Sequence, residues 1–192
     1  FEFWDEMFAL GTGWLEEFCD EYGSKIGLPW TAFVRAETCT IDNLKMMKRA
    51  GAQIMAMGVE AGNEEYRRKH LKKRTTDRLI IEAFDNCREV GIETIASNII
   101  GLPYETPDLV RETIALNRRL DPNSLYFFHF APLPGTELYE VCKREGYLPE
   151  DQEFLYESAD NMIHQPSMTE ADLNRVWSEF RELQREIESK YE

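Results

Sequence analysis

The sequence predicts an α/β fold built around a parallel β-sheet. Apolar runs of strand-like composition alternate five times along the 192 residues with segments of helical spacing. The connections between successive runs are long enough for crossovers between parallel strands. Most of the runs are continuously apolar, which is typical of strands buried on both faces. Together these observations predict a parallel sheet, open or barrel-like, with helices outside it.

The predicted strands are apolar, β-branched or aromatic runs that end at glycine, proline or charged residues. In chain order they span residues 1–4, 29–34, 53–58, 92–100 and 124–130. The predicted helices carry apolar residues three or four positions apart, and two of them begin after Thr40 and Thr136 as capping residues. In chain order they span residues 12–25, 41–50, 63–71, 76–90, 106–120 and 137–145.

The C-terminal part differs from this alternation. A loop over residues 146–165 precedes a long predicted helix over residues 169–191. Its apolar stripe consists of Leu173, Val176, Trp177, Phe180, Leu183 and Ile187. We expect this helix to pack on the body of the fold or to close its open edge, and the alternative is a partner-binding helix. We therefore divide the chain into a core, residues 1–148, and a C-terminal loop and amphipathic helix, residues 149–192.

Composition excludes several classes of function. The net charge of −14 argues against nucleic acid as a partner, because phosphate repulsion would have to be overcome locally. No apolar run approaches the roughly 20 residues that span a bilayer, and no signal peptide opens the chain, so we expect a cytoplasmic protein. The four cysteines are scattered singly and form no CxxC or CxxxC spacing, so they predict no metal or redox site among themselves.

Acidic residues stand at the ends of two early strands. Asp5 and Glu6 end the first strand, and since adjacent side chains leave a strand in opposite directions, at most one should face a central pocket. Glu60 follows the third strand between Gly58 and Gly62, which allow the backbone to approach a ligand closely. Each acid taken alone is equally compatible with a helix-start charge or a solvated loop residue.

The stretch IASNIIGLPYET, residues 95–106, is a third strand end of this kind. It contains Asn98 and Ile99 in an apolar run, a sharp bend at Gly101, and Glu105, which we expect in the first turn of the next helix. Backbone amides at such a bend can contact a flat ring or an anion. Carboxyl ends of neighbouring parallel strands meet at one edge of a sheet, so these strand ends predict one composite pocket.

Two further polar side chains lie near strand ends. Arg35 directly follows the second strand, and His129 stands in the aromatic run of the fifth. A lone histidine in such a run is more often a satisfied core residue than a ligand-binding one.

The ordered set of strand-end motifs resembles the core of the radical S-adenosylmethionine (SAM) enzymes, specifically the cobalamin-linked branch that includes the anaerobic magnesium-protoporphyrin monomethyl ester cyclases. The resemblance covers roughly residues 1–145 and rests on residues 3–8, 35, 57–64, 71–73, 100–106 and 132–139. It implies a partial (β/α)6 TIM-like barrel that lacks its first β/α unit and carries a C-terminal helical extension.

The resemblance also implies a cofactor and roles for the strand-end residues. Asp5 or Glu6 would hold the methionyl amino group of SAM, and Glu60 would contact its ribose or methionyl moiety. Ile99, Gly101 and nearby backbone would pack on adenine, with Glu105 supporting the turn. Arg35 and Asn98 complete the cofactor-binding set that the resemblance implies.

The defining CxxxCxxC loop of the family, which binds a [4Fe–4S] cluster through three thiolates, is absent from this sequence. We therefore expect a fragment, inactive by itself, whose cluster ligands lie outside this chain. The parent enzyme would reductively cleave SAM to methionine and a 5′-deoxyadenosyl radical that attacks a small organic substrate. A cobalamin-binding domain is expected upstream, which implies chemistry like that of a tetrapyrrole cyclase or a methyltransferase.

Two alternatives remain open. An ordinary TIM-barrel lyase or aldolase needs a catalytic lysine or a His/Asp metal set at the strand ends, and we expect none because Lys72 and Lys73 fall in a charged helix. A non-catalytic interaction domain would use the helix over residues 169–191, and its test is whether the apolar stripe is buried.

Overall fold

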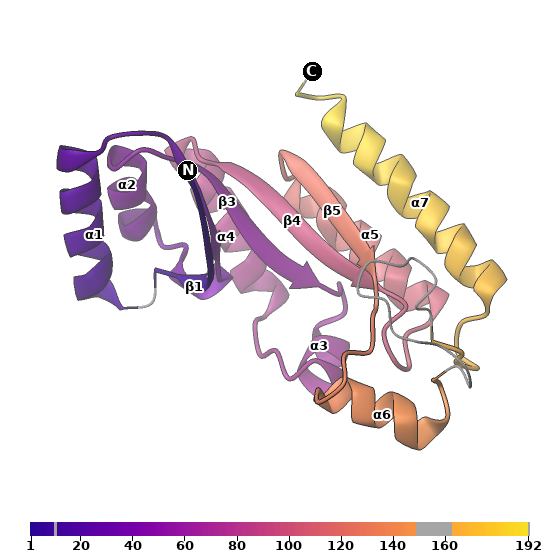
Figure 1. Cartoon of the computed structure of the whole chain (residues 1–192). Helices are drawn as coiled ribbons and strands as arrows, with labels where there is room; N and C mark the ends of the chain where they lie inside the picture. Colours follow the sequence, from indigo (N-terminus) through magenta and orange to yellow (C-terminus); the bar gives the residue numbers. More distant parts are fainter. Residues whose placement is uncertain (10, 149–162, 192) are drawn as a thin grey trace.

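Five parallel strands form one open sheet, in which strand order follows chain order from β1 to β5 (Figure 1). The computed structural model describes residues 1–9, 11–148 and 163–191, without the side chains of residues 6 and 12. The strands are β1 (Glu2–Phe8), β2 (Trp30–Val34), β3 (Ala52–Glu60), β4 (Glu93–Ile100) and β5 (Ser124–His129). The predicted parallel α/β fold is confirmed. Since β1 and β5 are separate edges, the sheet is a partial barrel.

The helices alternate with the strands. They are α1 (Thr12–Lys25), α2 (Ile41–Arg49), α3 (Glu64–His70), α4 (Asp77–Val90), α5 (Pro107–Leu120), α6 (Glu137–Glu145) and α7 (Glu170–Glu188). From α2 onward each helix follows a Thr or Asn whose side-chain oxygen accepts the backbone N–H three residues later. A short 3-10 turn over Ala36–Thr38 was not expected.

Two strands extend further than the sequence predicts. Asp5 and Glu6 lie inside β1 rather than after it, and Glu60 is the last residue of β3. Carboxylates are rare in strands buried on both sides, but β1 is an edge strand and Asp5 is exposed, so its charge stays in water. The prediction that both strands end earlier was therefore wrong.

The two faces of the sheet differ in exposure. One face packs against α2, α4 and α5, and it buries Trp30, Met55 and Leu125. In Figure 1, α4 and α5 lie behind the strands. The other face exposes large aromatic side chains: Trp4 is 75% exposed and Phe128 is 57% exposed. The expectation that both faces are buried was therefore wrong. We call this exposed face the inner face, because its apolar residues would line the lumen if the barrel were closed.

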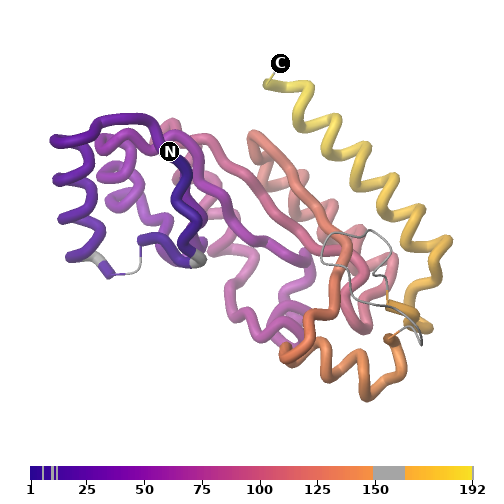
Figure 2. Tube along the Cα trace, viewed as in Figure 1, coloured from indigo at the N-terminus to yellow at the C-terminus, as the bar shows by residue number. Residues whose placement is uncertain are grey.

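The C-terminal helix belongs to the same hydrophobic core as the sheet. Figure 2 shows α7 running along the β5 side of the molecule, far from the N-terminus. Its stripe packs against α5 and β5, and the Phe180 ring lies 4.8 Å from that of Phe127. The stripe is therefore not a free binding surface, which removes the support for the interaction-domain alternative. The predicted division after residue 148 adjoins residues 149–162, which lie outside the described part of the chain, and it stays a prediction.

Truncating this contact should be costly. Phe180 is fully buried, so Phe180→Ala removes its packing on β5 and leaves a cavity, and we expect a loss of about 3–5 kcal/mol in the free energy of unfolding. Urea denaturation measures it, with Arg181→Ala, one residue along on the exposed face, as the control. A loss below about 1 kcal/mol would contradict this packing of α7.

Among the described residues, no helix has the length and apolar character needed to cross a membrane.

Candidate functional site

A cleft of about 470 Å³ lies at the carboxyl ends of β1, β2 and β3. Its polar wall includes Asp5, Arg35, Glu37, Glu60, Lys73 and Thr75, and its apolar wall includes Trp4, Phe33, Met57 and Val59. Three residues that the sequence places at separate strand ends, Asp5, Arg35 and Glu60, thus line one cleft. The side chain of Glu6 is outside the described part of the structure.

Glu60 has an unusual backbone conformation. Its φ is 68°, and the N–H of Ala61 donates to the carbonyl oxygen of Val59 at 2.9 Å, so Glu60 is the central residue of a γ-turn with positive φ. A non-glycine residue in this region costs about 1–3 kcal/mol and persists only where the surroundings hold it. A Cβ at the neighbouring Gly58 would lie 2.2 Å from Oε1 of Glu60, so any side chain there would displace the Glu60 carboxylate.

The ammonium of Lys73 is the partner of Glu60, with Nζ 2.8 Å from Oε1 and 3.3 Å from the carbonyl oxygen of Gly58. This lysine could not be recognised from the sequence, where Lys73 is expected in a charged helix. In the structure α3 ends at His70, and Lys73 lies in the following loop, which returns to the end of β3. The expectation of no lysine at the strand ends was therefore wrong. The ion pair nevertheless disfavours a lyase-type Schiff base, since a charged, paired amine is a poor nucleophile.

Arg35 pairs with a carboxylate two residues along the chain. Its guanidinium donates to both carboxylate oxygens of Glu37, at 3.0 and 3.3 Å, and Glu37 also accepts from the hydroxyl of Thr75. Arg35 remains half exposed, which leaves donors for a ligand. The cleft therefore presents two cations, Arg35 and Lys73, together with the carboxylates of Asp5 and Glu60.

Asn98 does not line this cleft. Its side chain is fully buried and exchanges hydrogen bonds with Asn117 of α5, at 2.8 and 3.3 Å. Ile99 faces the other side of β4 and packs against a second apolar cluster that includes Ala61 and Leu102. The Asn98 side chain thus fastens β4 to α5 rather than facing a ligand.

Glu105 lies before α5, not in its first turn as the sequence suggested, because Thr106 is the N-cap. Its buried carboxylate accepts the backbone N–H groups of Gly101, at 2.7 Å, and Leu102, at 3.2 Å. Gln165, which is distant in sequence, accepts from the N–H of Tyr104 at 2.7 Å. The turn amides that we expected to be free for an anion or a ring are therefore already taken.

Burial raises the pKa of Glu105 from 4.5 to about 8, against the two backbone hydrogen bonds that favour its ionised form. The folded state therefore holds the proton in the pH range where the unfolded chain releases it. The contribution of Glu105 to stability is therefore fully present below pH 4.5, falls by at most about 1.4 kcal/mol per pH unit as the pH rises towards 8, and is constant above that. Glu105→Gln should remove this dependence in urea denaturation series, and an unchanged slope would contradict it.

A second cavity, of about 310 Å³, lies beyond the ends of β4 and β5. Gly101, His129, His164 and Gln165 contribute to its wall. The His129 ring stacks on Trp177 of α7 at 3.8 Å, and its buried Nδ1 has no hydrogen-bond partner, so it is not the satisfied core histidine that the sequence suggested. Of the predicted residues, Gly101 thus lines this cavity, whereas Asp5, Arg35 and Glu60 line the cleft.

The cysteines do not fit an iron–sulfur cluster. All four are buried, and burial raises the pKa of Cys19 and of Cys142 to about 11, which disfavours the thiolates that bind iron. In the part of the chain that the structure describes, no group of three or more Cys, His, Asp or Glu side chains is placed to hold a metal ion.

Comparison with known proteins identifies the family of this chain. The family model for the radical SAM superfamily matches residues 15–116, more than half of the chain. An "uncharacterized methyltransferase" of Pyrococcus horikoshii is 30% identical over 117 residues, which cover 61% of this chain and 25% of the relative. The anaerobic magnesium-protoporphyrin IX monomethyl ester cyclase of Cereibacter sphaeroides is 30% identical over 133 residues, 66% of this chain and 21% of the relative. The chain thus spans about a quarter of the length of these relatives.

A solved structure supports the fold. The radical SAM methyltransferase TsrM of Kitasatospora setae, with cobalamin and a [4Fe–4S] cluster bound, superposes with a TM-score of 0.68 at 15% identity, over 86% of this chain and 40% of that one. The parallel sheet, the ordered strand-end motifs and the family match lead to one conclusion: this chain belongs to the radical SAM superfamily.

Proposed function

We propose that these residues form the SAM-binding wall of a radical SAM enzyme. The observation that carries the proposal is the Glu60–Lys73 pair at the end of β3, in the same cleft as Asp5 and Arg35. SAM at neutral pH carries an ammonium and a carboxylate on its methionyl part and hydroxyls on its ribose. In the cleft, carboxylates can bind the ammonium, cations can bind the carboxylate of SAM, and a further carboxylate can accept hydrogen bonds from the ribose hydroxyls.

The roles follow from position. Asp5 lies at the exposed edge strand and accepts hydrogen bonds from the methionyl amino group. Lys73 and Arg35 bind the methionyl carboxylate, and Glu60 accepts from the ribose hydroxyls while its ion pair holds it in place. Adenine lies towards Ile99 and Gly101, on a turn whose shape is fixed by Glu105 and whose amides are not ligand donors.

A [4Fe–4S] cluster, when bound in such an enzyme, supplies the electron that cleaves SAM. The described residues of this chain do not hold it, so we propose that its ligands come from a part of the protein outside this sequence. By itself this chain should then give no brown chromophore after anaerobic reconstitution with iron and sulfide, and no SAM cleavage.

The class of reaction is proposed from the relatives. Two of them are a methyltransferase and a tetrapyrrole cyclase, and TsrM carries cobalamin, which supports a cobalamin-linked enzyme with its cobalamin domain outside this chain. The exposed aromatic residues of the inner sheet face, Trp4, Phe33, Tyr126 and Phe128, would wall the space for a small organic substrate. We propose that the enzyme acts in the cytoplasm.

Isothermal titration calorimetry of the chain with SAM and with S-adenosylhomocysteine tests the proposal. Both should bind, and S-adenosylhomocysteine, which lacks the sulfonium charge but keeps the amino acid and the nucleoside, should compete with SAM. Adenosine alone should bind much more weakly, because it lacks the groups recognised by Asp5, Arg35 and Lys73. Equal binding of adenosine, or no binding of either compound, would contradict this arrangement.

A further inference from the structure

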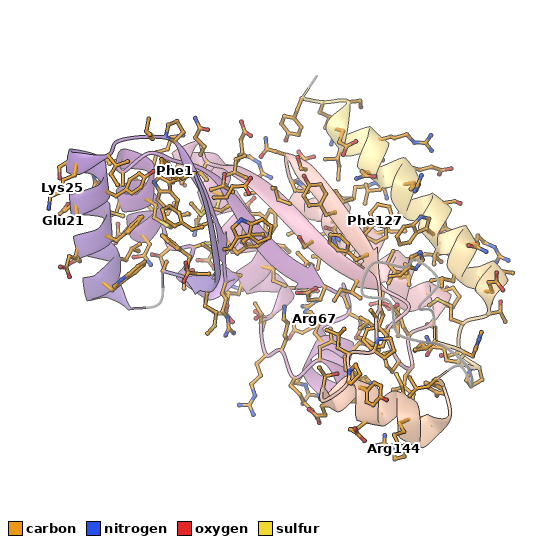
Figure 3. All side chains as sticks on the ribbon, viewed as in Figure 1. Phe1, Glu21, Lys25, Arg67, Phe127 and Arg144 are labelled. Carbon is orange, nitrogen blue, oxygen red and sulfur yellow. The ribbon has the colours of Figure 1, made fainter. Side chains whose placement is uncertain are left out.

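We propose that Arg67 is a positioning residue that holds both partners of the Glu60–Lys73 pair in the geometry that binds SAM. Arg67 lies in α3, beneath the end of the sheet, and its side chain is fully buried (Figure 3). It does not line the cleft and would not touch SAM. The inference rests on the proposed function, because it assigns a cause to the geometry of that site.

The guanidinium of Arg67 joins the two loops that carry the pair. Nη1 donates to the carbonyl oxygen of Ala61, at 2.6 Å, directly after Glu60. Nη2 donates to the carbonyl oxygen of Thr75, at 3.3 Å, two residues after Lys73, and forms an ion pair with Asp77. One planar group thus holds the chain next to each member of the pair.

The backbone of Arg67 adds a third connection. Its carbonyl oxygen accepts the N–H of Lys73 at 3.1 Å, so the loop after α3 is fixed at two points by the same residue. Glu60 needs such support, since its positive φ is kept only if the chain around it is held in place. Arg67 does this through Ala61, the residue whose N–H closes the γ-turn.

The choice of arginine is informative. Burying a cation is unfavourable unless it is paired and hydrogen-bonded, and an apolar side chain would fill the same space at less cost. A lysine in this place could not satisfy two carbonyl oxygens and a carboxylate with a rigid fork of donors. The Nε of Arg67 has no hydrogen-bond partner. The guanidinium is thus oriented so that its two Nη atoms bind the two loops while Nε is left unsatisfied.

The test compares Arg67→Lys with Arg68→Lys, a matched change at the exposed neighbour on the same helix. Arg67→Lys should weaken SAM binding about tenfold, whereas Arg68→Lys should leave it unchanged. Amide hydrogen exchange should quicken at Ala61 and Lys73 in Arg67→Lys only. Wild-type affinity together with wild-type exchange at both amides would overturn the proposal.

A positioning role is separated from a general structural one by a double-mutant cycle. If Arg67 acts through Glu60, then Arg67→Lys should cost little further affinity in a Glu60→Gln background, and fully additive losses would overturn the proposal. If Arg67→Lys fails to fold, Asp77→Asn provides a second variant, because it removes the ion pair of Nη2. We expect SAM affinity to fall about threefold in Asp77→Asn. Unchanged affinity would overturn the proposal. If the wild-type chain binds no SAM, the proposed function fails, and the exchange at Ala61 and Lys73 still decides whether Arg67 holds the loops.

Discussion

Replacing Gly62 by alanine is expected to destabilise the fold by about 3 kcal/mol or more and to remove most SAM affinity. A Cβ at Gly62 would lie 2.4 Å from the N and Cα of Thr113 and from the carbonyl oxygen of Glu112, all backbone atoms of α5. Backbone in the middle of a packed helix cannot move aside as a flexible side chain can. The loop after Glu60 would have to lift instead, and the hydrogen bond from the N–H of Gly62 to the Thr113 hydroxyl, now 2.7 Å, would break.

Gly13→Ala is the matched control for this prediction. Gly13 lies near the start of α1, and a Cβ there has no neighbour within 4 Å, so alanine should be neutral or slightly stabilising through its helix propensity. Urea denaturation and SAM titration of both variants measure the difference. A Gly62→Ala protein as stable as Gly13→Ala would contradict the close packing of α5 on the Glu60 loop.

Replacing Lys73 by methionine should weaken SAM binding by about 10- to 100-fold while the fold is retained. The change removes the cation proposed to bind the methionyl carboxylate and leaves Glu60 without its partner. Lys73 is 39% exposed, so part of the effect is screened by water, and stability should change by less than about 1 kcal/mol.

Lys72→Met provides the control for the loss of charge alone. Lys72 is the adjacent residue and is more exposed. Its Nζ lies 3.8 Å from Oε1 of the exposed Glu137, a weak surface ion pair, so Lys72→Met should leave SAM affinity within about twofold. Calorimetric titration of both variants at one ionic strength gives the comparison. Equal losses in both would mean that general electrostatic attraction, not the Glu60–Lys73 geometry, governs binding.

The regular elements could be predicted because their signals are local. Helical spacing and capping residues such as Thr40 and Thr136 located the helices to within a few residues, and apolar runs located the strands. The full length of β1 was not predicted, because carboxylates in the sequence indicate the end of a buried strand. They are tolerated within β1 because this strand lies at the edge of the sheet.

The site could be predicted only in part because it depends on contacts between distant segments. Asp5, Arg35 and Glu60 follow from the rule that parallel strands place their carboxyl ends together. The position of Lys73 at the cleft depends on where α3 ends, and the N–H of Tyr104 is taken by Gln165, which lies beyond α6 in the chain. No periodicity or spacing encodes these contacts.

We propose that SAM lies across the ends of β1 to β4, between Asp5 and Gly101. The most direct measurement is a nuclear magnetic resonance titration of the isotope-labelled chain with SAM, followed at the backbone amides. Perturbations are expected at Gly58, Glu60, Lys73 and Gly101 and should be absent along the exposed face of α7. Saturable shifts confined to any other surface, or none at millimolar SAM, would contradict the assignment of this cleft.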